Sequence, residues 1–169
     1  MVSPSVTATT RPPRLGEERE ADDAFLRHLS AAEFEAMLAR DEFLEHAVVY
    51  GYRYGVPRAP IREALARGED AVLRTDVQGA RYIKSVVPGA VTIFLLPPSW
   101  EELERRLRSR ASDSPEQMEL RLRTAREELA AAAEFDHAVV NHDLDRCAEA
   151  VEALLTAERA RPGRQAVSV

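Results

Sequence analysis

The apolar positions of the chain change their spacing several times, and each change predicts a new element. Short apolar or alternating runs predict strands at residues 5–9, 46–50, 70–77, 90–98 and 137–141. Apolar residues three and four positions apart predict helices at residues 31–40, 60–67, 77–85, 100–110, 115–134 and 145–161. Because strands alternate with helices over most of the length, the sequence predicts an α/β fold with a mainly parallel sheet flanked by helices.

Two of these segments allow a sharper prediction. Ser30, with Glu33 three residues later, has the pattern of a capping box at the start of the helix at 31–40. The run AVTIFLLPP is the most apolar in the chain and lies between Gly89 and a turn at the two prolines. Such a run is typical of a parallel strand that is buried on both faces.

Composition and charge narrow the class of protein. The chain has 169 residues, enough for one domain, which we place at residues 1–161 with a flexible tail at 162–169. The net charge of −6 argues against a general nucleic-acid binder, and no apolar run is long enough to cross a membrane. The single cysteine, Cys147, fits a reducing compartment and predicts a cytoplasmic location. The four histidines lack the spacing of a metal site.

The stretch TATTRPPRLGE near the start of the chain is a candidate anion-binding loop. Arg11 and Arg14 can offer two planar guanidinium groups to a phosphate, and Glu17 can orient one of them. The two prolines between the arginines lower the entropy lost when the loop is ordered around a ligand. An exposed loop whose arginines form surface ion pairs explains the same residues about equally well.

Two carboxylates lie next to predicted strands. In EFLEHAVVYGYRYG, Glu45 precedes a strand and could accept two N–H bonds from a guanine edge, and Tyr54 could reach a phosphate. A solvated glutamate with aromatic residues on a sheet edge is the alternative. Asp76, in TDVQG at a strand end, stands where α/β folds often place a catalytic or ligand-binding carboxylate, although a plain turn residue fits as well.

The segment RRLRSRASDSPEQMELRLR is rich in arginine. Arg106 and Arg110 lie four residues apart on one predicted helix face, and Arg121 follows a break, so the three could close over a polyphosphate like a lid. The alternative is an exposed helix stabilised by glutamate–arginine pairs four residues apart. These pairs are Glu101–Arg105, Glu102–Arg106 and Glu104–Arg108.

Taken in order, these segments resemble the guanylate kinase family. The resemblance runs from residue 5 to about 161 through TATTRPPRLGE, DEFLEHAVVYGYRYG, TDVQGAR, IFLLPPSWEELERRLRSRASDS and DHAVVNHDLDR. It implies a nucleoside-monophosphate-kinase-like fold of the phosphate-loop type, with a GMP-binding region at about 11–60 and a lid at about 100–122. It also implies the conversion of ATP and GMP to ADP and GDP, with Mg²⁺.

The resemblance assigns roles to individual residues. The residues implied to bind GMP are Thr7, Arg11, Arg14, Glu17, Glu45, Tyr54 and Asp76. The residues implied to act in catalysis are Arg106, Arg110, Arg121 and Asp76. Asn141 matches the residue near adenine, and no metal ligand is implied among the side chains of these 169 residues.

The chain departs from the family pattern in several places. Family members begin with a strand, a G-x-x-x-x-G-K-[ST] phosphate loop and its helix, and no such motif occurs in these 169 residues. Asp23 stands near the place of a family tyrosine, Val56 replaces a hydroxyl residue, and Arg74 replaces an acidic one. We therefore expect weak or no kinase activity from this chain alone, with ATP and Mg²⁺ used only if it is catalytic.

Two other functions are compatible with these departures. One is a non-catalytic guanylate-kinase-like module that binds a protein partner, and the other is a repurposed enzyme that binds GMP but does not use ATP. The loss of an interior strand would leave unpaired strand edges, so we also expect a homodimer or a second polypeptide that covers them. Neither a nucleic acid nor a membrane is expected as a partner.

Overall fold

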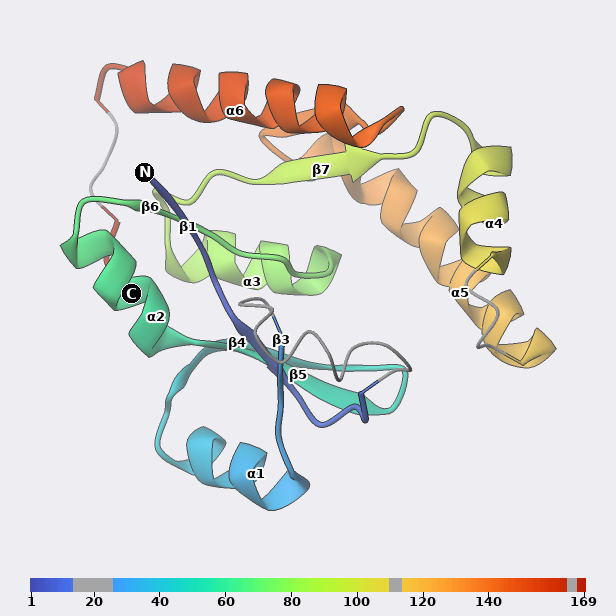
Figure 1. Cartoon of the computed structure of the whole chain (residues 1–169), viewed down its shortest axis with the longest axis horizontal. Helices are drawn as coiled ribbons and strands as arrows, with labels where there is room; N and C mark the ends of the chain where they lie inside the picture. The colour runs from blue at the N-terminus through green and yellow to red at the C-terminus, as the bar shows by residue number, and fades with distance from the viewer. Residues whose placement is uncertain (14–25, 110–113, 164–166) are drawn as a thin grey trace. The chain divides into compact units, whose positions relative to one another are not determined.

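A computed structural model of the chain describes residues 1–13, 26–109, 114–163 and 167–169. The fold has two compact units, Met1–Ala90 with Ala166–Val169 (unit 1) and Val91–Gln165 (unit 2). Helices and strands alternate in both units, which confirms the predicted α/β class (Figure 1). None of the described helices is both long enough and apolar enough to span a membrane.

Unit 1 contains most of the strands. Its elements are β1 (Val2–Pro4), β2 (Thr7–Thr9), β3 (Leu26–His28), α1 (Ala31–Ala39), β4 (Phe43–Val49), β5 (Tyr52–Pro57), α2 (Arg58–Ala66), β6 (Asp70–Val72) and α3 (Val77–Val86). The strands form a four-stranded sheet in the order β3-β2-β5-β4 and a parallel pair of β1 with β6. The predicted helices are present with small shifts at their ends, whereas β1, β3 and β5 have no counterpart among the predicted strands.

The four-stranded sheet is mixed, although three of the five strand pairings in the described residues are parallel. β2 pairs with β3 in parallel, but β5 is antiparallel to both β2 and β4. The reason lies in the connection between β4 and β5, where only Tyr50 and Gly51 separate the last pair of the ladder. Both residues have positive φ, 50° and 82°, as a two-residue type I′ hairpin turn requires. Such a short turn permits only an antiparallel pairing.

Helices cover both faces of the β4–β5 hairpin (Figure 1). On one face the Phe43 ring stacks on Phe34 of α1, with 4.5 Å between the ring centroids. Gly55 fits beneath that ring, because a Cβ at this position would lie 2.7 Å from a Phe43 ring carbon. On the other face Val56 packs with Ile83 of α3 in a second apolar cluster. The hairpin is therefore held rigidly between two cores.

The predicted capping box at α1 is confirmed. The Ser30 side chain accepts a hydrogen bond from the Glu33 backbone, and the Glu33 carboxylate accepts one from the Ser30 backbone. Part of the segment predicted to be a flexible tail contacts unit 1, where Val167 and Val169 pack against the second apolar cluster. The Nε of Arg62 donates to the carbonyl of Val169 over 2.6 Å.

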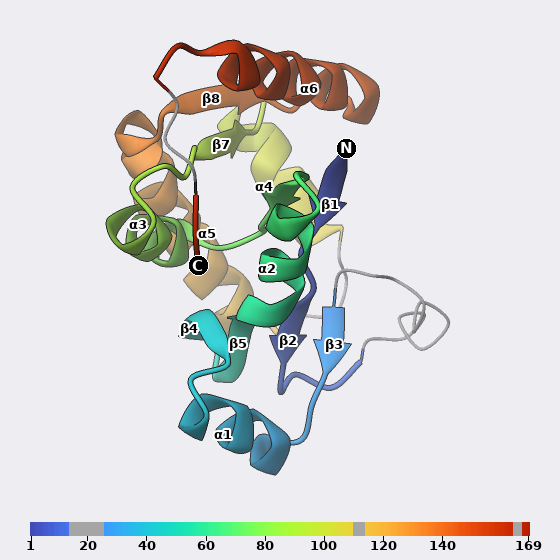
Figure 2. The ribbon, with the colours of Figure 1, turned by 90° about the vertical axis from the view of Figure 1, so that its left-hand side faces the viewer.

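Unit 2 has a smaller sheet. Its elements are β7 (Ile93–Leu96), α4 (Trp100–Arg108), α5 (Pro115–Ala130), the 3₁₀ helix η2 (Ala131–Glu134), β8 (His137–Val140) and α6 (Leu144–Ala160). β7 and β8 pair in parallel, and α6 lies alongside them (Figure 2). The prediction that the strand at β7 is buried on both faces is wrong. None of its side chains is buried and Leu95 is 53% exposed, because in the described residues this sheet has only two strands.

Candidate functional site

The four-stranded sheet presents three of the predicted residues on one face. Glu45 of β4 pairs with Val56 of β5, and Tyr54 pairs with Thr9 of β2. Because side chains alternate along a strand, residues two apart share a face, so Thr7 lies on the same side as Glu45 and Tyr54. The sheet therefore brings together Thr7, Glu45 and Tyr54, which are far apart in the sequence.

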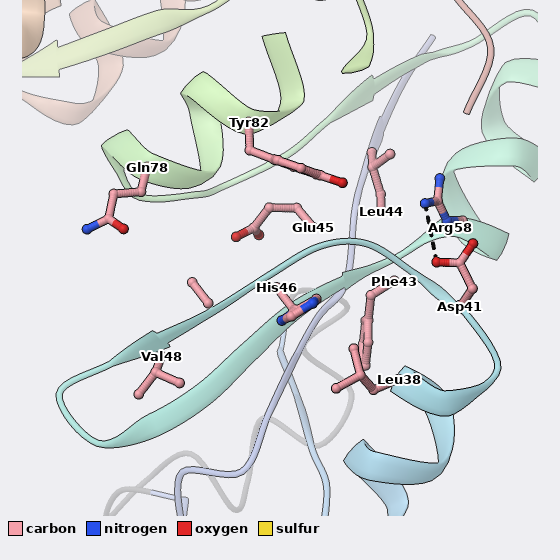
Figure 3. Close-up of a pocket in the computed structure, with 11 residues that line it drawn as sticks. Leu38, Asp41, Phe43, Leu44, Glu45, His46, Val48, Arg58, Gln78 and Tyr82 are labelled. Carbon is pink, nitrogen blue, oxygen red and sulfur yellow. Dashed lines mark ion pairs between the residues drawn. The ribbon is translucent and has the colours of Figure 1, made fainter. Parts of the chain in front are cut away.

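A cavity of about 460 Å³ opens along β4, the edge strand of this sheet. Figure 3 shows Tyr82 and Gln78 of α3 on one side of it and residues of β4 and α1 on the other. Arg58 lines one end, with its Nη2 3.7 Å from Asp41 Oδ1. Sequence reasoning did not identify Arg58, Gln78 or Tyr82, although Gln78 and Tyr82 lie four residues apart in the helix that follows Asp76.

Glu45 is the acidic group at this cavity. The residue is only 7% exposed, and in the described part of the chain its carboxylate has no hydrogen bond and no ion pair. Burial and, to a smaller degree, the negative charge of Asp76 raise its pKa to about 7. A buried carboxylate without a partner is costly, and an N–H donor from a ligand would remove that cost.

Asp76 has a structural role that the sequence left open. It is the N-cap of α3, and its Oδ1 accepts a hydrogen bond from the Gly79 N–H over 2.8 Å. Its charge also acts on Glu45, so the two carboxylates lie near each other. The structure thus places Asp76 near Glu45, while its catalytic role stays a prediction.

The start of the candidate anion loop is anchored to the same sheet. The backbone N–H of Arg11 donates to Thr9 Oγ1 over 3.1 Å, and that hydroxyl donates to the carbonyl of Arg53 over 2.9 Å. The Arg11 carbonyl lies 2.7 Å from Nδ1 of His28. Thr9 and His28 were not predicted, and their roles depend on pairing between strands. Arg14 and Glu17, like Asp23, lie outside the described residues.

The arginines of unit 2 lie in a different environment. Nε of Arg106 donates to Glu102 over 2.6 Å, and its Nη2 is 3.4 Å from the carbonyl of His142. Hydrogen bonds from Arg105 and Arg106 lower the pKa of Glu102 to about 2. The expected ion pair of Glu104 with Arg108 is also present, whereas Arg105 pairs with Glu102 and not with Glu101.

Asn141 lies next to the residue that Arg106 contacts. It follows β8 directly, and its backbone N–H donates to the carbonyl of Leu96 at the end of β7 over 2.7 Å. Arg106 thus reaches the residue that follows Asn141, at the carboxyl end of β8. Arg121 lies half-buried on α5, and Arg110 is outside the described residues.

The helices that carry these arginines are joined by an aromatic contact. The guanidinium of Arg126 in α5 stacks over the ring of Trp100 in α4, 4.6 Å from its centroid. Neither α4 nor α5 has a fully buried side chain. In the part of the chain that the structure describes, no group of three or more His, Cys, Asp or Glu residues is placed to hold a metal ion.

Comparisons with known proteins agree on one family. The family model described as guanylate kinase matches residues 2–158. The guanylate kinase of Gloeobacter violaceus is 54% identical over 154 residues, 91% of this chain and 74% of its own length. A guanylate kinase of Thermus thermophilus is 49% identical over 160 residues, 95% of this chain and 71% of its own length.

The fold gives the same result. A crystal structure of guanylate kinase from Anaplasma phagocytophilum matches with a TM-score of 0.81 and 32% identity, covering 97% of this chain and 79% of that one. The fold class and the order of the quoted segments predicted from the sequence are both consistent with it. This chain belongs to the guanylate kinase family.

Proposed function

We propose that unit 1 binds GMP, with the Glu45 carboxylate accepting hydrogen bonds from the two adjacent N–H donors of the guanine edge. The observation that carries this proposal is the buried, unpartnered carboxylate at a cavity of about 460 Å³. A group that only accepts hydrogen bonds complements an edge that only donates them. The nearby Asp76 adds a second negative group that disfavours ligand acceptors at the same place.

The phosphate of GMP is assigned to the other end of the same sheet face. Thr7 and Tyr54 share the face with Glu45, and the anchored backbone of Arg11 starts the loop that also contains Arg14 and Glu17. Guanidinium groups bind phosphate with paired, charge-assisted hydrogen bonds. The proposal therefore assigns the base to Glu45 and the phosphate to Arg11 and Arg14.

Calorimetric titration with GMP tests the acceptor half. The Glu45→Gln variant should bind GMP about 10–100-fold more weakly, because a charged hydrogen bond contributes about 1.5–3 kcal/mol. Glu42→Gln is the matched control, since that carboxylate is exposed and paired with Arg40. AMP, which presents an acceptor where guanine presents a donor, should bind wild-type protein more weakly than GMP. Equal affinity of wild type and Glu45→Gln for GMP would refute the proposal.

We propose that these 169 residues alone transfer a phosphoryl group from ATP slowly or not at all. They contain no G-x-x-x-x-G-K-[ST] segment, which in phosphate-loop enzymes supplies the backbone cradle, the lysine and the hydroxyl that holds Mg²⁺. Arg106, Arg121 and Asn141 offer charge and hydrogen bonds to a nucleotide but no substitute for that cradle. The residues present therefore do not fit Mg²⁺·ATP by themselves.

A coupled assay on the purified 169-residue polypeptide tests this second proposal. With GMP, ATP and Mg²⁺, turnover should lie far below the usual kinase range of about 1–100 s⁻¹. Turnover within that range would refute it. Fusing a strand, phosphate loop and helix from a related kinase before residue 1 is the positive control, because restored turnover shows that the acceptor half is intact.

A second candidate function, a protein-binding module, rests on the loss of a ligand donor at Val56. This side chain is 1% exposed in an apolar cluster at a position where the family pattern has a hydroxyl. We further propose that a second copy or another polypeptide covers the two-stranded sheets, which have unpaired edges within the described residues. Light scattering of purified protein tests for a dimer.

A cytoplasmic location remains a proposal that rests on the single cysteine.

A further inference from the structure

We infer that Gly79 is a positioning residue for Glu45, because the absence of a side chain at this place in α3 leaves the space that the Glu45 carboxylate occupies. The inference rests on the proposed function, since it concerns the same cavity. Gly79 is buried in the first turn of α3 and does not have a positive φ. The backbone there does not need glycine, and alanine is the better helix former. Space is therefore the property that glycine provides.

The space around Gly79 is tight on two sides. A Cβ at this position would lie 3.1 Å from both Cδ and Oε1 of Glu45, and 2.9 Å from the Cβ of Thr75. The Cβ of Thr75 is attached directly to the backbone and cannot turn away. The carboxyl group of Glu45 ends a flexible side chain, so it is the group that would move. A methyl group at position 79 would displace it by a few tenths of an ångström within the cavity.

Gly79 also contacts the second carboxylate, but through its backbone. Its N–H donates to Asp76 Oδ1 over 2.8 Å. Any residue except proline keeps this N–H donor, so the hydrogen bond to Asp76 stays available in Gly79→Ala, although the contact with the Thr75 Cβ requires a small shift of the turn before α3. A shift of that turn would act on every ligand and in every background, so comparisons between nucleotides and between Glu45 backgrounds separate it from the positioning of Glu45.

The first measurement needs no ligand. A ¹³C-carboxyl NMR titration should give a pKa of about 7 for Glu45 in the wild type. In Gly79→Ala it should rise by about half a unit or more, because the methyl group excludes water from the carboxylate. The other titratable or charged groups that face it are the same in both proteins: Asp76, Tyr82, His46, Arg58 and Asp41. An unchanged pKa would overturn the inference.

The second measurement uses GMP and inosine monophosphate, which lacks the 2-amino group. Gly79→Ala should weaken GMP binding about tenfold or more, and inosine monophosphate binding much less. In a Glu45→Gln background, Gly79→Ala should have little further effect, because the group that it displaces has already lost its charge. Equal losses for both nucleotides, or equal losses in both backgrounds, would contradict a role through Glu45.

Two more variants complete the design. Ser85→Ala is the helix control, since it raises helix propensity at an exposed position of α3 and should leave the pKa and both affinities unchanged. If Gly79→Ala does not fold, adding Glu45→Asp should restore folding, because aspartate withdraws the carboxylate by one methylene. A double variant that still does not fold counts against the inference. A pKa rise in a protein that does not bind GMP would refute the proposed function and leave the positioning role standing.

Discussion

Glu45 in unit 1 and Glu102 in unit 2 are glutamates whose surroundings move the pKa in opposite directions. Burial without a partner raises the pKa of Glu45 to about 7, whereas hydrogen bonds from Arg105 and Arg106 lower that of Glu102 to about 2. Glu102 is satisfied by its own helix, as expected for a structural ion pair. Glu45 has no hydrogen-bond or ion-pair partner among the described residues, as expected for the ligand-binding carboxylate proposed above.

The same contrast appears in the packing of the two units. Most of the side chains that are almost completely buried belong to unit 1, among them Phe34, Val56 and Thr9. In unit 2 the described buried side chains are small or lie in the strand, at Ala131, Val139 and Cys147. Unit 1 is thus a rigid support for a preorganised site, while the arginines of unit 2 are carried on helices with little burial.

The largest expected effect is on the core of unit 1. Phe34→Ala removes a ring that is 1% exposed and stacked on Phe43, so it should lower the free energy of unfolding by about 3–5 kcal/mol. The comparison is Phe94→Ala in unit 2, whose half-buried ring meets Phe135 edge-on at 5.0 Å and whose loss should be smaller. Urea denaturation measures both. A larger loss for Phe94→Ala would reverse the contrast between the units.

The second effect is the pH dependence that Glu45 gives to stability. Its pKa is about 7 in the fold, against 4.5 ordinarily, so the folded state holds the extra proton between these pH values. The free energy of unfolding therefore falls as the pH rises from about 4.5 through about 7, by at most about 3–4 kcal/mol at 1.36 kcal/mol per unit. Glu45→Gln should lack this fall in urea denaturation at about pH 5 and about pH 8.

Glu102→Gln is the matched variant for that titration. Because the pKa of Glu102 is lowered, its contribution to the free energy of unfolding is lost only as the pH falls from 4.5 to about 2. The variant and the wild type should therefore show the same change in unfolding free energy between about pH 5 and about pH 8. If the unfolding free energy of Glu45→Gln fell with pH as much as that of the wild type, the fall would not come from the buried Glu45 carboxylate. The contrast between the two glutamates would then be contradicted.

Features held within a few neighbouring residues were predictable from the sequence. The capping box of Ser30 with Glu33 spans a single turn, and the ion pair of Glu104 with Arg108 spans four residues. Both depend on helical spacing alone. The arginine–glutamate pattern of α4 could therefore be interpreted without knowing what surrounds the helix.

Features that depend on distant segments were not predictable. β5 contains Gly55 and polar residues, and it becomes a strand because β2 and β4 pair with it on both sides. Glu45 was predicted, but its cavity is completed by Arg58 and Tyr82 from two other helices. The exposure of Leu95 could not be predicted either, because an apolar run does not show how many strands flank it.

The third prediction compares helix caps in the two units. Ser30→Ala and Ser114→Ala each remove a capping box, at α1 and α5, and each should cost about 1 kcal/mol of unfolding free energy. Replacement by glycine should cost only a few tenths, because glycine is tolerated at the N-cap. Far-UV circular dichroism with urea measures the losses. No loss at Ser114 would show that α5 needs no cap of its own.

The smallest effect is expected at the exposed ion pair of Glu104 with Arg108, which are 33% and 59% exposed. Glu104→Gln removes a charge four residues before an arginine on α4 and should cost about 0.3–0.5 kcal/mol at low salt. The loss should vanish in about 1 M salt, where screening extends over only about 3 Å. Arg108→Gln should give the same loss, and the double variant no more than either. A loss above about 1 kcal/mol that persists in salt would mean that this part of unit 2 is buried against something, and the contrast with unit 1 would fail.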